Sequence, residues 1–158
     1  SQQITLSKET IDLYYMLVQL SDELSPVFAP RGNAVVLRLD EELTVEADPE
    51  KLARVFSNIL KNAASYSYPH TEIMISAEKS EHEVIIQFQN SGEDIPSEAL
   101  ASLFDKFYRA DKSRSSDTGG TGLGLAIAKE IVMLHGGTIS AASKNHVVTF
   151  TISLPLAH

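Results

Sequence analysis

Apolar residues recur at helical spacing in three parts of the chain, and residues that start or stop helices bound each part. The first pattern ends at the Pro30-Arg31-Gly32-Asn33 break. The second begins at Asp48 and Pro49, which are typical of an N-cap and a first-turn proline. The patterns predict helices over residues 9–29, 49–67 and 121–134, with a shorter one over residues 98–104.

Between these helices lie short segments rich in β-branched residues, bounded by turn residues. The polar turn Lys79-Ser80-Glu81-His82 joins two of them into a hairpin, and the segment from Asn90 to Pro96 is predicted to be a loop. The predicted strands are residues 34–39, 42–46, 72–78, 83–89, 138–142 and 147–154, and we expect the second to pair with the first.

The order of these elements predicts an α+β fold. It is a two-layer sandwich in which helices cover one face of a mixed, mostly antiparallel sheet. No regular strand–helix–strand alternation is seen, which argues against a Rossmann-type nucleotide fold. With 158 residues, 43% of them hydrophobic, the chain is expected to form one domain over residues 1–158.

Charge and cysteine content exclude several classes of function. The formal net charge of −8 repels nucleic-acid phosphates and anionic lipid, so we expect no nucleic-acid binding and no direct membrane contact. No stretch approaches the roughly 18 apolar residues of a membrane span, and the first residues lack a signal-peptide pattern. The absence of cysteine excludes disulfides and thiolate chemistry, and it is compatible with the cytosol.

Six of the eight glycines lie between residues 119 and 137, and four of them belong to Gly119-Gly120-Thr121-Gly122-Leu123-Gly124. Glycines at a helix start let backbone N–H groups approach an anion, which the helix dipole also attracts. Upstream, four basic residues against one acidic residue give a local charge of +3. Together these features favour a phosphate site under a basic lid, and a plain turn beside a solvated loop is the alternative. The charged residues are Lys106, Arg109, Asp111, Lys112 and Arg114.

Asn58 and Asn62 lie four residues apart on the second predicted helix, at the edge of its apolar stripe. Asparagine is a poor helix former, and its amide oxygen suits Mg²⁺, which takes few protein ligands when phosphates supply the rest. Buried amides that pair with backbone groups are the alternative. The segment Asn90-Ser91-Gly92 follows a strand, where the amide either bonds a base edge or forms a simple Asx turn.

In this order, the motifs resemble those of the ATP-binding catalytic domain of sensor histidine kinases, in the GHKL group with gyrase, the Hsp90 chaperones and MutL. The resemblance runs from about residue 5 to residue 155 and implies the Bergerat ATP-binding fold. Residues 107–111 and 113–120 are also similar to the VanS-type sensors of vancomycin resistance. The N box corresponds to residues 48–52 and 58–63, the first glycine box to residues 90–96, the F box to residues 104–109, and the second glycine box to residues 120–125.

The resemblance implies that Asn62 coordinates a Mg²⁺ that bridges the ATP phosphates, assisted by Asn58, and that Arg109 contacts the phosphates from a lid over residues 105–121. Asn58, Asn62 and Arg109 are therefore the expected catalytic residues, with the triphosphate between the asparagine helix and the glycine-opened helix. The expected nucleotide-binding residues are Asn62, Lys61, Tyr66, Asn90, Gly92, Ile95, Phe107, Gly120, Thr121, Gly122, Leu123, Gly124, Leu125 and Thr149.

Four positions depart from the family's pattern. Asn90 stands where an aspartate usually accepts from the adenine amino group, and Asp94 replaces the second glycine of that box. Ser65 stands where a lysine is frequent, for which Lys61 is a substitute, and Val148 occupies a frequent threonine position. Because an amide lacks the charge of a carboxylate, we expect modest adenine affinity.

Asn58 also stands where hydrolytic relatives carry a glutamate that activates water. An amide takes no proton near neutral pH, so we expect transfer of the ATP γ-phosphate to a histidine on a separate dimerisation domain. None of the five histidines lies in the family's acceptor pattern, so the chain is expected to bind ATP without phosphorylating itself. An anti-sigma-type serine kinase and a nucleotide-sensing pseudokinase are the alternatives.

The resemblance further implies a two-component signalling system. Its partners are ATP, the histidine-bearing dimerisation domain of the same kinase, and a response regulator. The chain is then expected to be a cytoplasmic domain of a membrane-anchored bacterial sensor.

Overall fold

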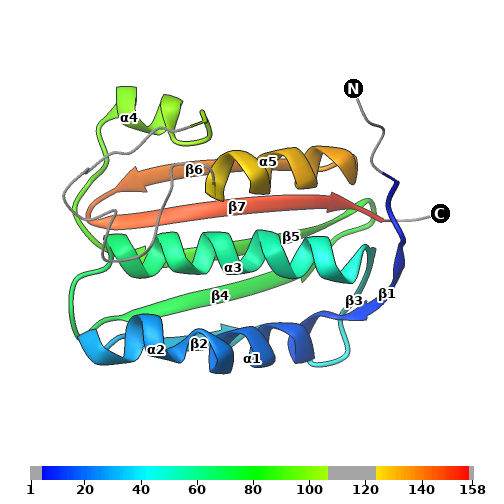
Figure 1. The fold of residues 1–158 in the computed structure, drawn as a ribbon, viewed down its shortest axis with the longest axis horizontal. Helices are drawn as coiled ribbons and strands as arrows, with labels where there is room; N and C mark the ends of the chain where they lie inside the picture. Colours follow the sequence, from blue (N-terminus) through cyan, green and yellow to red (C-terminus); the bar gives the residue numbers. More distant parts are fainter. Residues whose placement is uncertain (1–4, 107–123, 157–158) are drawn as a thin grey trace.

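A computed structural model describes residues 5–106 and 124–156. In these residues a layer of helices covers one face of a five-stranded sheet, and a separate two-stranded sheet lies at one end (Figure 1). In chain order the elements are β1 (Glu9–Asp12), α1 (Leu13–Glu23), α2 (Ser25–Phe28), the 3-10 helix η1 (Ala29–Arg31), β2 (Ala34–Arg38), β3 (Thr44–Ala47), α3 (Pro49–Tyr66), β4 (Glu72–Lys79), β5 (Glu83–Ser91), α4 (Ser97–Ser102), α5 (Gly124–Leu134), β6 (Thr138–Lys144) and β7 (Val147–Pro155).

The strand order of the large sheet is β2-β4-β5-β7-β6. The β2–β4 pair is parallel, and the other three pairs are antiparallel. Helices α1, α3 and α5 lie next to one another across this sheet, with α3 in the middle (Figure 1). The predicted α+β sandwich with a mixed, mostly antiparallel sheet is therefore confirmed.

The core forms between the helices and the sheet because side chains alternate along each strand. In β5, Val84, Ile86 and Phe88 are buried, and the residues between them point to the other face. The ring of Phe88 packs on that of Phe56 from α3, with centroids 5.7 Å apart. Helix α3 is thus anchored on the centre of the sheet.

Helix α3 begins and ends where its local sequence predicts. The Oδ1 atom of Asp48 accepts a hydrogen bond from the Lys51 backbone N–H at 3.2 Å, and Pro49 follows the cap. At the other end Ser67 is extended, with φ −77° and ψ 142°, because the Tyr68-Pro69 pair disfavours further helix. This geometry brings the predicted site residues of α3 to a defined place above the sheet.

The predicted first helix is wrong at its start. Residues Glu9–Asp12 form β1, which pairs antiparallel with β3, and the helix begins only at Leu13 with Asp12 as its N-cap. The predicted strand over residues 42–46 consequently pairs with β1 and not with β2. A four-residue segment fits either period, and the distant strand that completes its hydrogen bonds decides between them.

Two further boundaries differ from prediction, and a third lies outside the described residues. The chain leaves α1 at Leu24 and continues as two short helices, which end at Gly32 with φ +76°. Strand β5 extends to Ser91, so Asn90 lies in the strand and not in the predicted loop. The described part of the third predicted helix begins at Gly124, and residues 121–123 lie outside the described residues. Among the helices of the described segments, none is long and apolar enough to cross a membrane.

Candidate functional site

Helices α3 and α5 meet at the predicted second glycine box. The Nδ2 atom of Asn58 donates a hydrogen bond to the carbonyl oxygen of Gly124 at 2.9 Å. A Cβ atom at Gly124 would lie 3.7 Å from the Asn58 side chain, an ordinary contact. The asparagine-bearing helix and the glycine-opened helix are therefore neighbours, as the sequence predicts (Figure 1).

Asn62 follows Asn58 by one turn on the same side of α3. Its Oδ1 atom is buried and has no hydrogen-bond partner within residues 5–106 and 124–156. A buried acceptor left unpaired costs about 1–3 kcal/mol, so this oxygen is suited to a ligand atom that supplies positive charge. Lys61, the next residue back, is exposed.

One turn further along α3, Tyr66 contacts the first glycine box. A Cβ atom added at Gly92 would lie only 2.1 Å from the Tyr66 carbonyl oxygen and 3.3 Å from Nδ2 of Asn90. Only glycine allows the end of β5 to approach the end of α3 this closely. Asn58, Asn62 and Tyr66 thus form a row on α3 whose outer members touch Gly124 and Gly92, and the unpaired oxygen lies in the middle.

Asn90 is buried on the helix-facing side of β5, with 2% of its surface exposed. Neither its Oδ1 nor its Nδ2 atom has a hydrogen-bond partner among the residues that the structure describes. Its register partners, Ile73 on β4 and Val148 on β7, are both apolar and fully buried. The side chain consequently presents one donor and one acceptor that the described part of the protein leaves unused.

The turn between β6 and β7 holds the first glycine box in place. The backbone N–H of Gly92 donates to the His146 carbonyl at 3.0 Å, and the His146 N–H donates to Oδ1 of Asp94 at 2.7 Å. The hydroxyl of Tyr68 lies 3.0 Å from Nδ1 of His146. Nearby, the N–H of the buried Ile95 donates to the hydroxyl of Ser143 on β6 at 2.8 Å.

The sequence predicts strands on both sides of this turn but not its contact with the first glycine box. His146 and the residue before it, Asn145, both have positive φ, of 62° and 53°. An asparagine followed by a polar residue between two strands is a signal for a two-residue hairpin turn, which requires positive φ at both positions. No local signal, however, places that turn against Asp94.

Other predicted site residues lie away from the row on α3 or outside the described residues. Thr149 points away from the helices, because the neighbouring Val148 and Phe150 occupy the helix-facing positions of β7; its hydroxyl accepts from Gln89 at 3.4 Å. The prediction of Thr149 as a nucleotide-binding residue does not fit this placement. Leu125 is buried in the core. Phe107, Arg109, Gly120, Thr121, Gly122 and Leu123 lie outside the described residues.

The far end of α3 is fixed by Asp48. The Ser7 backbone N–H donates to Oδ2 of Asp48 at 3.0 Å, and this bond, with that of Lys51, holds the pKa of the carboxyl below its ordinary value. The N–H of Asp48 donates to Nε2 of the buried His135 at 3.0 Å, whose Nδ1 atom donates to the Ile131 carbonyl at 2.9 Å. These bonds join the N-terminal segment, α3 and α5.

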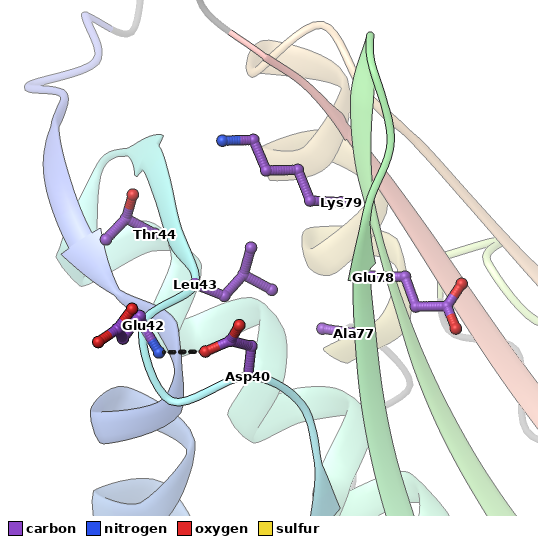
Figure 2. Close-up of a pocket in the computed structure, with 7 residues that line it drawn as sticks. All are labelled: Asp40, Glu42, Leu43, Thr44, Ala77, Glu78 and Lys79. Carbon is purple, nitrogen blue, oxygen red and sulfur yellow. Dashed lines mark hydrogen bonds between the residues drawn. The ribbon is translucent and has the colours of Figure 1, made fainter.

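A cleft of about 570 Å³ lies at the opposite end of the sheet from Asn90 (Figure 2). It contains the bond from the Glu42 N–H to Oδ1 of Asp40 at 2.8 Å, and none of its lining atoms is a buried polar atom without a partner. Residues 5–106 and 124–156 also contain no group of three or more His, Cys, Asp or Glu residues that could hold a metal ion. The lining residues are Asp40, Glu42, Leu43, Thr44, Ala77, Glu78 and Lys79.

Comparison with known proteins identifies the family of the chain. Residues 47–158 match the family described as histidine kinase-, DNA gyrase B-, and HSP90-like ATPase. The chain belongs to this ATPase family. The predicted family is thereby confirmed, and ATP is the nucleotide that the family's description names.

The similar proteins include sensor proteins and histidine kinases. The sensor protein VanS of Enterococcus faecium is 56% identical over 154 residues, which cover 98% of this chain and 40% of VanS. The chain thus spans about two fifths of the length of that relative. Among solved structures, the catalytic domain of histidine kinase ThkA is 26% identical with a TM-score of 0.82, covering 94% of this chain and 97% of that domain. A complex of ThkA with response regulator protein TrrA is 23% identical with a TM-score of 0.81, covering 96% of this chain and 42% of the matched ThkA chain.

Proposed function

We propose that residues 1–158 are the ATP-binding catalytic domain of a sensor histidine kinase. In this proposal the domain holds Mg-ATP and donates the γ-phosphate to a histidine on a separate dimerisation domain. The observation that carries the proposal is the buried Oδ1 atom of Asn62, which has no partner in the described part of the chain and lies in a row between the contacts of α3 with both glycine boxes.

A magnesium ion fits the chemistry of this row. The Asn62 amide oxygen is a hard, neutral donor, and Mg²⁺ is commonly bound by one or two protein ligands together with substrate phosphates. When bound, the ion neutralises charge on the phosphates. The residues of the chain then act by position: Asn62 supplies the oxygen, and Asn58 holds the start of α5 through the Gly124 carbonyl.

The same geometry favours phosphoryl transfer over hydrolysis. Asn58 occupies the position from which a glutamate would activate water, and its amide has no basic atom for that task. Its Nδ2 atom is instead committed to Gly124. A neutral histidine nitrogen needs no strong base to attack a phosphoryl group, so positioning and charge neutralisation are sufficient.

The relatives suggest the biological setting. VanS is a sensor protein, and ThkA forms a complex with a response regulator. We infer that this domain belongs to a bacterial two-component sensor of the vancomycin-resistance type. It would lie on the cytoplasmic side of a membrane-anchored protein, and a response regulator would receive the phosphoryl group from the phosphorylated histidine.

The proposal is tested by mixing the chain with a matching histidine-bearing dimerisation domain and γ-labelled ATP. We expect label on the dimerisation domain that is lost in acid and kept in alkali, as for phosphohistidine. A dimerisation domain without its acceptor histidine is the control and should remain unlabelled. Acid-stable label would instead indicate a serine kinase. Magnesium-dependent ATP binding without any transfer would indicate a nucleotide-sensing module.

A further inference from the structure

Asn90 is the one residue in the described ranges whose side chain carries both a donor and an acceptor that are buried and unpaired. With 2% exposure, these two atoms have almost no access to water in the folded chain. Leaving either atom unpaired is unfavourable, so the pair points to a ligand that supplies an acceptor and a donor side by side.

The residues that flank Asn90 on the adjacent strands are apolar and offer a ligand no polar side chain. The adjacent strands contribute Ile73 and Val148, which are apolar, and a Cβ atom at Gly92 would lie 3.3 Å from Nδ2. The amide is therefore the unpaired polar group that this part of β5 offers to a ligand, and apolar neighbours with one amide suit a flat heterocyclic base.

We infer that Asn90 makes the site accept purine nucleotides with either an amino or a keto group at carbon 6. This inference rests on the proposed nucleotide-binding function. Adenine presents an amino donor beside the acceptor N1, whereas hypoxanthine and guanine present a keto acceptor beside the donor N1–H. Rotation of the amide by 180° about its terminal torsion, which is broad and nearly two-fold, matches the first edge or the second.

A carboxylate at this position does not discriminate between the two edges by this pairing. It offers acceptors only, so it accepts from the adenine amino group or from the hypoxanthine N1–H, and it opposes the neighbouring N1 or keto oxygen with another acceptor. A side chain without polar atoms pairs with neither edge. Asn90→Leu, which keeps a similar side-chain size, is therefore expected to weaken the binding of both nucleotides.

The test measures the affinities of ADP and inosine diphosphate by calorimetry, in the presence of Mg²⁺, for the unmodified chain. The two probes differ at carbon 6 and in the proton at N1, so their affinity ratio cancels the contributions of the phosphates and the metal. Guanosine diphosphate is a less suitable probe, because its extra amino group tests space as well as pairing. We expect the two affinities to agree within about tenfold.

Two variants sharpen the test. Asn90→Leu should lower the affinities for ADP and for inosine diphosphate by at least about tenfold each. Gln89→Leu is the matched control: it makes the same substitution one residue away, on the opposite face of β5, and should leave both affinities unchanged.

The outcomes separate this inference from the proposed function. The inference is overturned if the unmodified chain binds ADP at least about 100-fold better than inosine diphosphate, or if folded Asn90→Leu binds both nucleotides as tightly as the unmodified chain. Should Asn90→Leu fail to fold, the affinity ratio for the unmodified chain decides alone. If neither nucleotide binds the unmodified chain, the proposed function itself is refuted.

Discussion

Gly92→Ala tests whether the close approach of β5 to α3 shapes the nucleotide site. The added Cβ atom would lie 2.1 Å from the Tyr66 carbonyl oxygen, whereas real Cβ contacts stay beyond 3.0 Å. One backbone segment must therefore move by about 1 Å, and the added atom also lies 3.3 Å from Nδ2 of Asn90. Because the obstacle is a main-chain carbonyl, no side-chain rotation relieves the clash.

The chain offers a matched control at Gly137. A Cβ atom there would lie 2.1 Å from the Ser153 carbonyl oxygen, the same distance to the same kind of atom. Ser153 pairs with Thr138 and Ile85, which places it at the end of the sheet away from Asn90. Gly137→Ala thus introduces an equal steric conflict that does not touch the candidate site.

Both substitutions should lower the free energy of unfolding by about 1–3 kcal/mol, the usual effect of overpacking. For a chain of this size that corresponds to a fall in Tm of about 2–4 °C per kcal/mol. Urea unfolding measures the stability, and calorimetry with Mg-ADP at a temperature where both variants are folded measures the affinity. We expect only Gly92→Ala to weaken Mg-ADP binding, by at least about tenfold, because it displaces Tyr66 and Asn90 together.

Two results would refute this reasoning. If Gly92→Ala changed stability by less than about 0.5 kcal/mol, the close contact with α3 would not exist in solution. If Gly137→Ala weakened Mg-ADP binding as much as Gly92→Ala, the effect on the nucleotide would come from general destabilisation.

Three other predictions concern Asn62, Asp48 and Asp94. Asn62→Ala should reduce Mg-dependent nucleotide binding by more than the roughly 10–100-fold that is lost when a residue supporting a metal ligand is removed. The free energy of unfolding should stay unchanged or rise, because the substitution deletes a buried acceptor that has no partner among the described residues. Unchanged affinity in calorimetry would exclude a metal role for Asn62. The Ser7 N–H holds the pKa of Asp48 below its ordinary value of 3.8, so the carboxylate stabilises the fold above that pH and the contribution is lost as the pH falls through the lower folded-state pKa. Urea titrations should therefore show the stability difference between the unmodified chain and Asp48→Asn shrinking below pH 3.8, and a constant difference from pH about 5 to 2.5 would contradict the assignment. Asp94→Ala removes the acceptor of the His146 N–H and should weaken Mg-ADP binding by the equivalent of about 0.5–1.5 kcal/mol, whereas Asp94→Asn keeps an acceptor oxygen and should retain most of the affinity; equal losses in the two variants would show that the bond does not position the loop.

Much of the fold was predictable because the signals are local. The start of α3 depends on Asp48 and Pro49, which act on N–H groups within the same turn. Its end depends on Pro69, and the β4–β5 hairpin depends on alternation within each strand. The row Asn58, Asn62 and Tyr66 was likewise foreseeable, since a spacing of four places residues on one side of any helix.

The errors fall where distant segments meet. Nothing near residues 9–12 indicates that they pair with β3, in which Glu46 is the partner of Thr10, 36 residues away. The placement of Thr149 depends on a one-residue register, which sends its side chain to the face opposite the helices. The bond between Asp94 and the backbone of His146 spans 52 residues, so no local pattern indicates it.

By itself the sequence determined the helices with local caps, the hairpins and the family-type motifs, because each depends on atoms a few residues apart. The tertiary structure decided which of these motifs touch, and which polar atoms are left buried without a partner, since burial and pairing depend on every segment that packs nearby. Only the tertiary structure shows that the Asn62 oxygen and the Asn90 amide are buried with no partner among the residues it describes.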